Sequence, residues 1–361
     1  MRAAISALFF AASAVASALA QSAVPAVAPA VVHGDAYPRA EVAFPNGVRG
    51  LPAIPYWTPN GFRPLTLDLY LPAASTPPPP SGLPLVVYIH GGAWLGGNSH
   101  ASGAFADFPG VLASLAARGY AVASINYRLS GEARFPAQAW DVKAAIRFLR
   151  LHAGEYGIDP ARAVAWGVSA GGHLSALADV TCHVPELAPR QTTGANHPEA
   201  APDEIVNAEV SDCIQGAIAW YGVFDMATIA EQSRRGGALS RDVASAPEWR
   251  LLGCFKTQCQ PDQIRLASPV SFVDHNTPPL LLIVGAADTT VPCHQTTEMA
   301  ARMRAAGAKY KLIVMPGVSH VLMGKTPDQT QDANLQALAA TFRFIDQTIG
   351  PAARRKAKAD E

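Results

Sequence analysis

The chain has 361 residues, of which 49% are hydrophobic and 16% charged, enough apolar material for one large domain or two small ones. Lys and Arg together number 28, as do Asp and Glu, so the formal net charge is zero. This balance argues against a nucleic-acid partner or an anionic membrane surface.

The first twenty residues resemble a secretory signal peptide. Arg2 supplies a positive charge, an apolar run follows, and Ala18-Leu19-Ala20 offers a cleavage site made of small residues. An N-terminal core helix is the alternative, but Ala and Pro repeats without helical period follow at once. No later apolar run approaches the ~18 residues that a membrane span needs. We therefore expect no membrane span, and a secreted or periplasmic protein after cleavage.

Strands alternate with helical stretches from about residue 65. Residues 65–71 alternate apolar and polar side chains, as in a strand with one solvated face, and residues 85–89 are continuously apolar, as in a strand buried on both faces. The segment 75–84, with four consecutive prolines, predicts a surface loop between these two strands. Further strands are expected at 121–125, 163–166, 216–220, 280–284 and 310–315, and helices at 104–118, 140–152, from 172 onward, and 330–348.

This order predicts an α/β fold with a mostly parallel central sheet and helices on both faces. In such sheets the reactive site lies at the carboxyl ends of the strands. The long irregular stretches at 181–211 and about 225–273 are expected as insertions over those ends. We expect residues 21–60 to be an N-terminal extension, 61–350 one domain, and 351–361 a disordered basic tail.

The segment Gly167-Val168-Ser169-Ala170-Gly171 falls between a predicted strand and a predicted helix. A serine on such a tight turn takes a strained backbone conformation, and glycines two residues to either side remove side chains that would clash. The turn lifts the hydroxyl above the sheet, near a helix N-terminus that favours negative charge. The pattern in this context predicts that Ser169 is a nucleophile.

The glycine-rich segment His90-Gly91-Gly92-Ala93-Trp94 follows the strand at 85–89. Attack on an ester carbonyl creates an oxyanion, and backbone N–H groups in such a loop can stabilise it. We expect Gly91, Gly92 and Ala93 to supply part of this oxyanion hole and Ala170, directly after the nucleophile, to supply the rest. A plain glycine-rich turn is the alternative. His90 is expected to hold the loop.

A serine nucleophile needs a base and a carboxylate that orients the base. His320 follows the strand at 310–315, and Asp288 follows the strand at 280–284, so both lie just past strand ends. Asp225, after the strand at 216–220, is the rival acid. The order Ser169, Asp288, His320 is a known nucleophile–acid–base order for this kind of sheet architecture. His173, on the helix after Ser169, is expected to pack.

The five cysteines can pair if the chain is exported. Cys254 and Cys259 are close in sequence, and Cys182 and Cys213 bracket one polar stretch, so we favour these two disulfides with Cys293 free. Spacing alone leaves the connectivity open. A zinc site is the rival interpretation, but no Cys-x-x-Cys or His-x-x-x-His pair supports it, and no metal is expected.

These motifs, together with Asn126-Tyr127-Arg128-Leu129 and Phe135-Pro136-Ala137 with Asp141, resemble the α/β-hydrolase superfamily over residues 65–345. The branch is the one related to hormone-sensitive lipase, and the nearest likeness is to secreted feruloyl and acetyl-xylan esterases. The resemblance implies hydrolysis of small carboxylic esters through an acyl-enzyme, with no cofactor. It implies Gly92, Ala93 and Ala170 as oxyanion donors, although the alanine in His-Gly-Gly-Ala-Trp, where many relatives have glycine, leaves open which two of Gly91, Gly92 and Ala93 donate.

The insertion at about 225–273 is where such enzymes place a lid. Its charged side chains, among them Glu231, Arg234 and Arg241, predict a small polar cap and small or polymer-linked esters, including ester-decorated polysaccharide, rather than fat droplets. Trp249, Leu251, Leu252 and Phe255 could line an acyl pocket or anchor the insertion. An amide hydrolase of formamidase or peptidase type, or a non-catalytic binding homologue, are the alternative functions.

Overall fold

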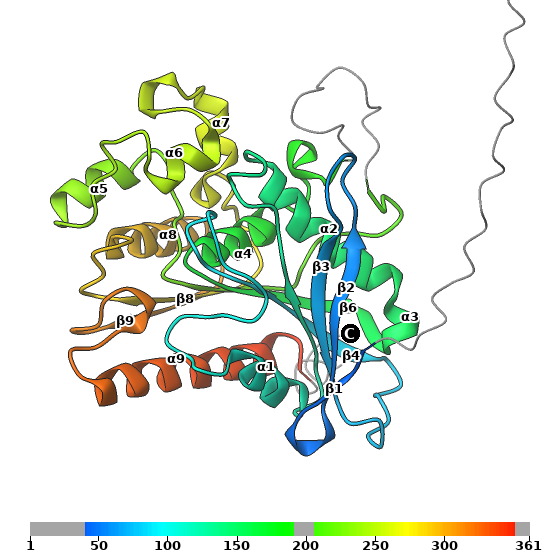
Figure 1. Cartoon of the computed structure of the whole chain (residues 1–361). Helices are drawn as coiled ribbons and strands as arrows, with labels where there is room; N and C mark the ends of the chain where they lie inside the picture. The colour runs from blue at the N-terminus through cyan, green and yellow to red at the C-terminus, as the bar shows by residue number, and fades with distance from the viewer. Residues whose placement is uncertain (1–39, 191–205, 351–361) are drawn as a thin grey trace, which may run out of the picture. The chain divides into compact units, whose positions relative to one another are not determined.

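The computed structural model describes residues 40–190 and 206–350. The expected signal peptide, residues 21–39 of the expected extension, and the basic tail lie outside the described residues. Within the described part, nine strands form one sheet in the order β1-β2-β3-β5-β4-β6-β7-β8-β9 (Figure 1). The strands are β1 (Val42–Ala43), β2 (Arg49–Trp57), β3 (Leu65–Leu71), β4 (Leu83–Ile89), β5 (Ala121–Ile125), β6 (Ile158–Val168), β7 (Ala217–Trp220), β8 (Leu280–Gly285) and β9 (Tyr310–Met315).

The sheet is antiparallel at its N-terminal edge and parallel elsewhere. β1, β2, β3 and β5 pair antiparallel in turn, and every pair from β5 to β9 is parallel. β2 lies in the span expected to be an extension, so the sheet begins before residue 61, because Arg49–Trp57 pairs with Leu65–Leu71 along its length. The carboxyl ends of β4, β6, β7, β8 and β9 therefore meet at one edge of the sheet.

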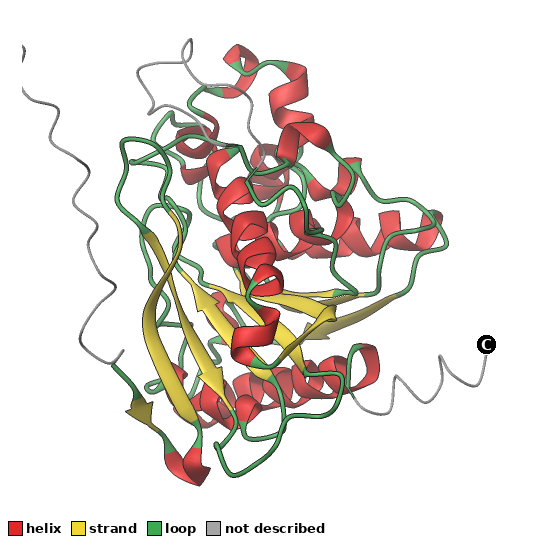
Figure 2. Cartoon of the chain, turned by 90° about the vertical axis from the view of Figure 1, so that its right-hand side faces the viewer, coloured by secondary structure: helices red, strands yellow, loops and turns green. Residues whose placement is uncertain are grey.

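Helices cover both faces of the sheet, as the sequence predicts (Figure 2). They are α1 (Phe108–Ala116), α2 (Ala137–Leu151), α3 (Ala153–Tyr156), α4 (Ala170–Val180), α5 (Ile229–Arg235), α6 (Pro247–Leu252), α7 (Pro261–Leu266), α8 (Cys293–Ala305) and α9 (Pro327–Thr348). Side chains of α2, α4 and α8 share one apolar cluster with Leu85 and Val87 of β4. Those of α1 and α9 share another with Val86 and Tyr88. Alternate side chains of β4 thus pack into two apolar cores on opposite faces of the sheet, which explains its continuous apolar sequence.

Capping residues define where the helices begin more precisely than the apolar pattern does. α1 begins at Phe108 rather than at 104, because the Asp107 side chain accepts a hydrogen bond from the N–H of Gly110 at 2.9 Å. α9 begins at Pro327, three residues before the predicted start, because Thr326 caps it through the N–H of Gln329. No helix was predicted at the position of α8.

The insertion between β7 and β8 contains the short helices α5, α6 and α7 and forms the cap. Leu251 and Leu252 are buried in the main apolar cluster and anchor the cap, whereas Trp249 belongs to the same cluster and also lines a cavity described below. Both expected disulfides are present: Cys182–Cys213, and Cys254–Cys259 within the cap. Cys293 is free. In the part of the chain described here, no helix combines the length and apolarity needed to cross a bilayer.

Candidate active site

Ser169 lies between the end of β6 and the start of α4, in a left-handed backbone conformation (φ 53°, ψ −117°). Its N–H donates to the carbonyl oxygen of Trp220 on β7 at 2.8 Å, and its carbonyl oxygen accepts from the N–H of His173 at 3.0 Å. These bonds hold Ser169 in a strained backbone conformation that L-amino acids rarely adopt. The turn lies beside the central strands, at their carboxyl ends.

Two glycines make this turn sterically feasible. A Cβ on Gly167 would lie 2.1 Å from the carbonyl oxygen of Gly171, and a Cβ on Gly171 would lie 2.0 Å from the carbonyl oxygen of Ile89. Both contacts are to backbone, which cannot rotate away. The turn, the next helix and β4 therefore pack as closely as only glycine permits.

The structure brings Ser169, His320 and Asp288 together at the same edge of the sheet. His320 Nε2 lies 3.1 Å from Ser169 Oγ, and His320 Nδ1 lies 2.7 Å from Asp288 Oδ2. Since a carboxylate only accepts, Nδ1 carries the proton, and Nε2 is left with a lone pair facing the hydroxyl. This is the arrangement in which a neutral imidazole can remove a proton from a serine.

Asp288 is fixed by its own loop. Its Oδ1 accepts from the N–H groups of Thr290 at 2.8 Å and Val291 at 2.9 Å, which leaves Oδ2 for the histidine. Its side chain is fully buried, so no water competes for that bond. The rival acid Asp225 instead accepts from the N–H of Ala227 at 2.7 Å and is not brought to His320.

The loop after β4 lies against the serine turn. A Cβ on Gly91 would lie 3.4 Å from that of Ser169, and Gly92 (φ 111°) has no room for one, because the carbonyl oxygen of Gly96 would be 2.1 Å away. Ala93 also has positive φ (57°). Among residues 40–190 and 206–350, no acceptor takes the N–H of Gly92 or Ala93. Ala170 opens α4, and its N–H is one of the helix's unsatisfied donors.

His90 stabilises this loop through a hydrogen bond and a ring contact. Its Nδ1 donates to the carbonyl oxygen of Gly91 at 2.7 Å, and its ring stacks on Tyr127 with centroids 4.3 Å apart. Burial lowers the pKa of His90 to about 4, so the ring is neutral at physiological pH.

His173 packs, as expected, and joins the serine helix to the cap. Trp94 Nε1 donates to His173 Nδ1 at 3.2 Å, so the ring proton is on Nε2, which donates to the carbonyl oxygen of Ala267 at 2.9 Å. Burial lowers its pKa to about 4 as well.

Two contacting residues were missed by the sequence analysis. Tyr221 packs its ring against His320, and Arg241 of the cap bonds to the loop that carries Asp288. Tyr221 directly follows β7, so its place at the carboxyl end of a strand could have marked it as a site residue. Arg241 lies in an irregular segment and gives no sequence signal.

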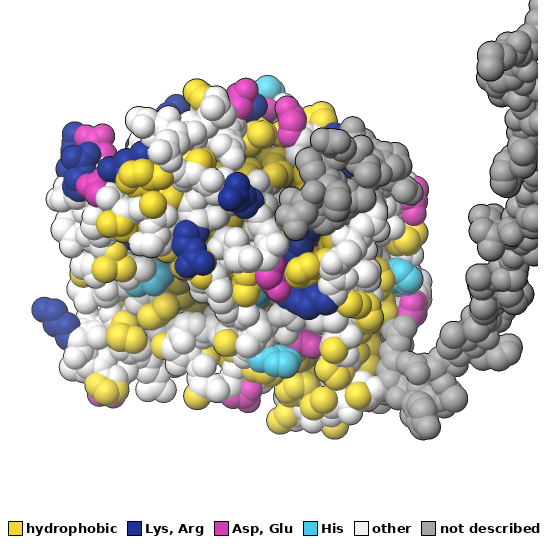
Figure 3. Space-filling view, turned by 45° about the horizontal axis from the view of Figure 1, so that its top comes forward, with side chains coloured by type: hydrophobic (Ala, Val, Ile, Leu, Met, Phe, Trp, Pro, Cys, Tyr) yellow, Lys and Arg dark blue, Asp and Glu magenta, His cyan; other side chains and the backbone are white. Residues whose placement is uncertain are grey.

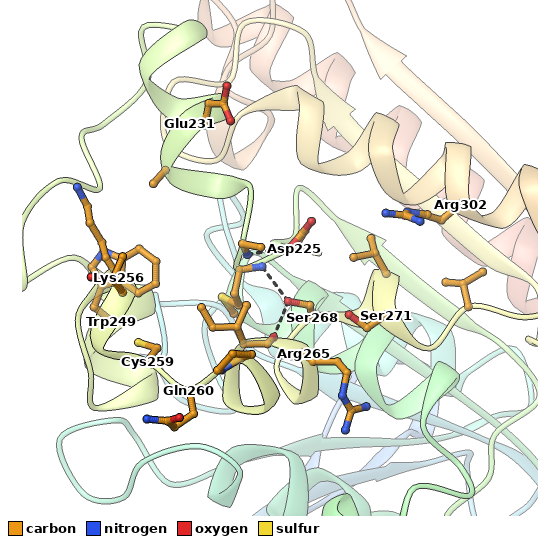
Figure 4. A pocket seen from close by; sticks show the side chains of 18 of the residues that line it. Asp225, Glu231, Trp249, Lys256, Cys259, Gln260, Arg265, Ser268, Ser271 and Arg302 are labelled. Atoms are coloured by element: carbon orange, nitrogen blue, oxygen red, sulfur yellow. Dashed lines mark hydrogen bonds between the residues drawn. The ribbon is translucent and has the colours of Figure 1, made fainter.

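A cavity of about 1240 Å³ lies under the cap, and the three hydrogen-bonded residues are not among its lining. Figure 4 shows Asp225 at its centre, with Lys256 and Trp249 on one side and Arg302 on the other. Its basic and acidic side chains are mixed, and Figure 3 shows the same dispersion of both charges over one face of the molecule.

Among the described residues, Cys182, His183 and Cys213 have ligand atoms within 4.8 Å of one another. Both sulfurs are joined in the disulfide, so they do not offer the thiolates that zinc requires.

Comparisons with known proteins agree with this architecture. The chain is 32% identical to the esterase LipC of Mycobacterium tuberculosis over 243 residues, 67% of this chain and 54% of LipC. It is 29% identical to the probable carboxylic ester hydrolase LipM of the same organism, over 61% of this chain and 45% of LipM. The chain thus spans about half the length of these curated relatives.

Among solved structures, a truncated carbohydrate esterase from gut microbiota superposes with a TM-score of 0.65 at 30% identity, covering 85% of this chain and 98% of that one. Esterase Est2 of Thermogutta terrifontis, bound to propionate, gives a TM-score of 0.60 at 27% identity, covering 82% and 93%. The BD-FAE family model matches residues 67–303. This chain therefore has the α/β-hydrolase fold and belongs to the BD-FAE family.

Proposed function

We propose that the protein is a serine carboxylic ester hydrolase with Ser169 as nucleophile, His320 as general base and Asp288 as the residue that orients the histidine. The observation that carries the proposal is the hydrogen-bonded chain from Ser169 Oγ through His320 to Asp288 Oδ2. The esterases among its relatives support the reaction class.

In the proposed reaction, Ser169 Oγ attacks the ester carbonyl while His320 Nε2 takes the hydroxyl proton. The carbonyl oxygen becomes an oxyanion, which the N–H of Ala170 and two among those of Gly91, Gly92 and Ala93 stabilise. The C–O bond to the alcohol then breaks, His320 returns the proton to the alcohol oxygen, and an acyl-serine remains. Water, deprotonated by the same imidazole, releases the carboxylic acid and regenerates the serine.

The substrate class that we propose is small or polymer-linked carboxylic esters, including esters on polysaccharides. The cap helices are short, and their exposed residues are largely charged, with Arg234 and Arg235 beside Glu231 on α5. Such a surface lacks the broad apolar face that binding to an oil droplet requires. The likeness to a carbohydrate esterase supports the polymer-linked option.

The decisive experiment compares the wild-type protein with Ser169→Ala on p-nitrophenyl acetate and butyrate, feruloyl esters, acetylated xylan, long-chain esters and N-formyl amides. We expect rapid cleavage of short or polymer-linked esters and a fall in kcat of ~10⁴–10⁶-fold in the variant. Ser114→Ala, an exposed serine on α1, is the matched control and should behave as wild type. Wild-type turnover in Ser169→Ala would refute the assignment of Ser169 as nucleophile. Faster cleavage of amides than of esters would identify the protein as an amide hydrolase instead.

Acyl-enzyme formation has a separate readout. Rapid quenching with p-nitrophenyl acetate, followed by peptide mass analysis, should find one acetyl group on the peptide that contains Ser169. Turnover with no acyl group there at any time point would contradict the covalent route.

We also propose that residues 1–20 are removed during export to the periplasm or medium, leaving a domain from about residue 40 to 350 between an N-terminal segment and a basic tail. The two disulfides support an oxidising compartment. Fractionation of expressing cells and N-terminal sequencing of the product test this, and a cytoplasmic protein that retains Met1 would refute it.

A further inference from the structure

Tyr221 occupies an unusual backbone position directly after β7. Its φ is 41°, in the left-handed region that favours glycine, and its N–H donates to the carbonyl oxygen of Ile283 on β8 at 2.6 Å. A bulky residue in this conformation is strained and persists only where the surrounding structure enforces it. Tyr221 is 1% exposed, so its surroundings enclose the residue and hold it in this conformation.

The Tyr221 ring meets His320 edge to face. The centroids are 4.8 Å apart and the ring planes make an angle of 66°. This geometry is favourable for aromatic pairs, because the positive edge of one ring meets the negative face of the other. The contact is therefore strong enough to bias the orientation of the imidazole.

The imidazole of His320 projects from a short and irregular backbone segment. His320 begins a single 3-10 turn in which Val321 and Leu322 both have positive φ, and 15% of its side chain is exposed. The bond from Nδ1 to Asp288 fixes one atom of the ring but permits tilting about that atom. Tyr221 provides a surface against which the tilt is limited.

The ring, rather than the hydroxyl, makes this contact. Within the described residues, the Tyr221 hydroxyl makes no hydrogen bond, and a Cβ added at Gly103 would lie 3.2 Å from it. Burial raises the pKa of the phenol well above 10, so the group is neutral. Removing the hydroxyl would break no bond in the described structure.

We propose that Tyr221 is a positioning residue for the reaction proposed above: its ring holds the His320 imidazole so that Nε2 stays directed at Ser169 Oγ. Proton transfer needs that contact near 3 Å, and a displacement of about 1 Å can cost ~100-fold in rate. The inference rests on the proposed function, because it assigns the ring a part in that same proton transfer.

The test uses Tyr221→Phe, Tyr221→Leu and Tyr221→Met on the full chain. Phe keeps the ring, so kcat should stay within ~3-fold of wild type; Leu and Met remove it, so kcat should fall by ~10–100-fold while KM changes by less than ~3-fold. Labelling of Ser169 by a fluorophosphonate should slow in parallel, since it reports the same hydroxyl. Tyr120→Leu is the matched control: Tyr120 is also buried but bonds Asp346 on α9, so the variant should lose stability and keep its labelling rate.

Rescue by Phe distinguishes positioning from a general loss of packing. Wild-type kcat in Tyr221→Leu and Tyr221→Met, or an equal loss in Tyr221→Phe, would overturn the inference while leaving the esterase assignment intact. If wild-type protein cleaves no ester, the proposed function fails, whatever these variants show. If the Leu variant does not fold, the Met variant, with its flexible side chain, decides.

Discussion

Arg241 of the cap donates from Nη2 to the carbonyl oxygen of Thr290 at 2.6 Å, two residues beyond Asp288. The N–H of Thr290 in turn donates to Asp288 Oδ1 at 2.8 Å. Arg241 also pairs with Glu248, and both side chains are at least 95% buried. The cap and the loop of the proposed catalytic acid are therefore joined by one buried arginine.

We expect Arg241→Met to destabilise the protein by about 3–5 kcal/mol, because it leaves the Glu248 carboxylate buried without its cation. Urea unfolding measures this directly. The double variant Arg241→Met with Glu248→Leu removes both charges and should recover much of the loss. A single variant as stable as wild type would show that water replaces the arginine.

Gly171→Ala should abolish activity. Its Cβ would lie 2.0 Å from the carbonyl oxygen of Ile89, so β4 or the serine turn must move and the Ser169–His320 contact must lengthen. We expect a loss of ~100-fold or more in kcat/KM. Gly154→Ala, where a Cβ would meet nothing within 4 Å, is the control and should be as active as wild type. Retained activity in Gly171→Ala would contradict the steric argument.

The two disulfides should contribute unequally to stability. They close segments with separations of 31 and 5 residues. In the loop-entropy treatment, losing Cys182–Cys213 costs about 3.7 kcal/mol and losing Cys254–Cys259 about 2 kcal/mol. Chemical unfolding of the paired Cys→Ala variants compares the two, and the reverse order would indicate that native-state contacts outweigh chain entropy.

His90 and His173 should make the protein sensitive to acid. Their folded pKa values of about 4 lie below the ordinary value of 6.5. Between these two pH values the unfolded chain binds more protons, so stability falls as the pH drops from 6.5 toward 4 and levels off below that. Each residue should contribute up to ~2 kcal/mol of loss by pH 4.5.

Unfolding free energies at pH 7.5 and 4.5 test this. His90→Asn should show a smaller difference between the two, since asparagine does not titrate. An unchanged difference in His90→Asn would show that His90 does not carry the effect.

Asp179 should have the opposite dependence on pH. Both of its carboxylate oxygens are buried, with no hydrogen-bond partner in the described structure, and burial raises its pKa well above 3.8. The native state thus keeps a proton that the unfolded state loses, so this group lowers stability as the pH rises above 3.8, by at most ~1.4 kcal/mol per unit. Asp179→Asn should gain stability relative to wild type between pH 4.5 and 6.5. Parallel curves would contradict this.

The central strands could be predicted because their burial is written in continuous apolar runs. Residues 85–89 face two cores and contain no charged side chain, and the strand at 280–284 was found by the same signal. β2 could not be found this way. Pro52 and Pro55 suggest a loop, yet the strand accommodates both at shifts in its pairing with β3.

The residues proposed for catalysis could be located because each follows a predicted strand, and the fold brings those strand ends together. α8 was missed because its sequence, from Cys293 to Ala305, has few large apolar residues to show a helical period. Tyr221 contacts a residue 99 positions away, and only its place directly after β7 could have marked it. Arg241 bonds to a residue 49 positions away, a tertiary contact for which local sequence carries no signal.

His320 follows β9, the outermost strand of the parallel half, whereas Ser169 follows β6 in the middle of the sheet. β9 is bonded along one side to β8, and most of its residues are partly exposed. Edge strands open at lower free energy than central ones. Heating should accordingly separate His320 from Ser169 before the body of the protein melts, and thermal stability would be gained by reinforcing β9 rather than the interior.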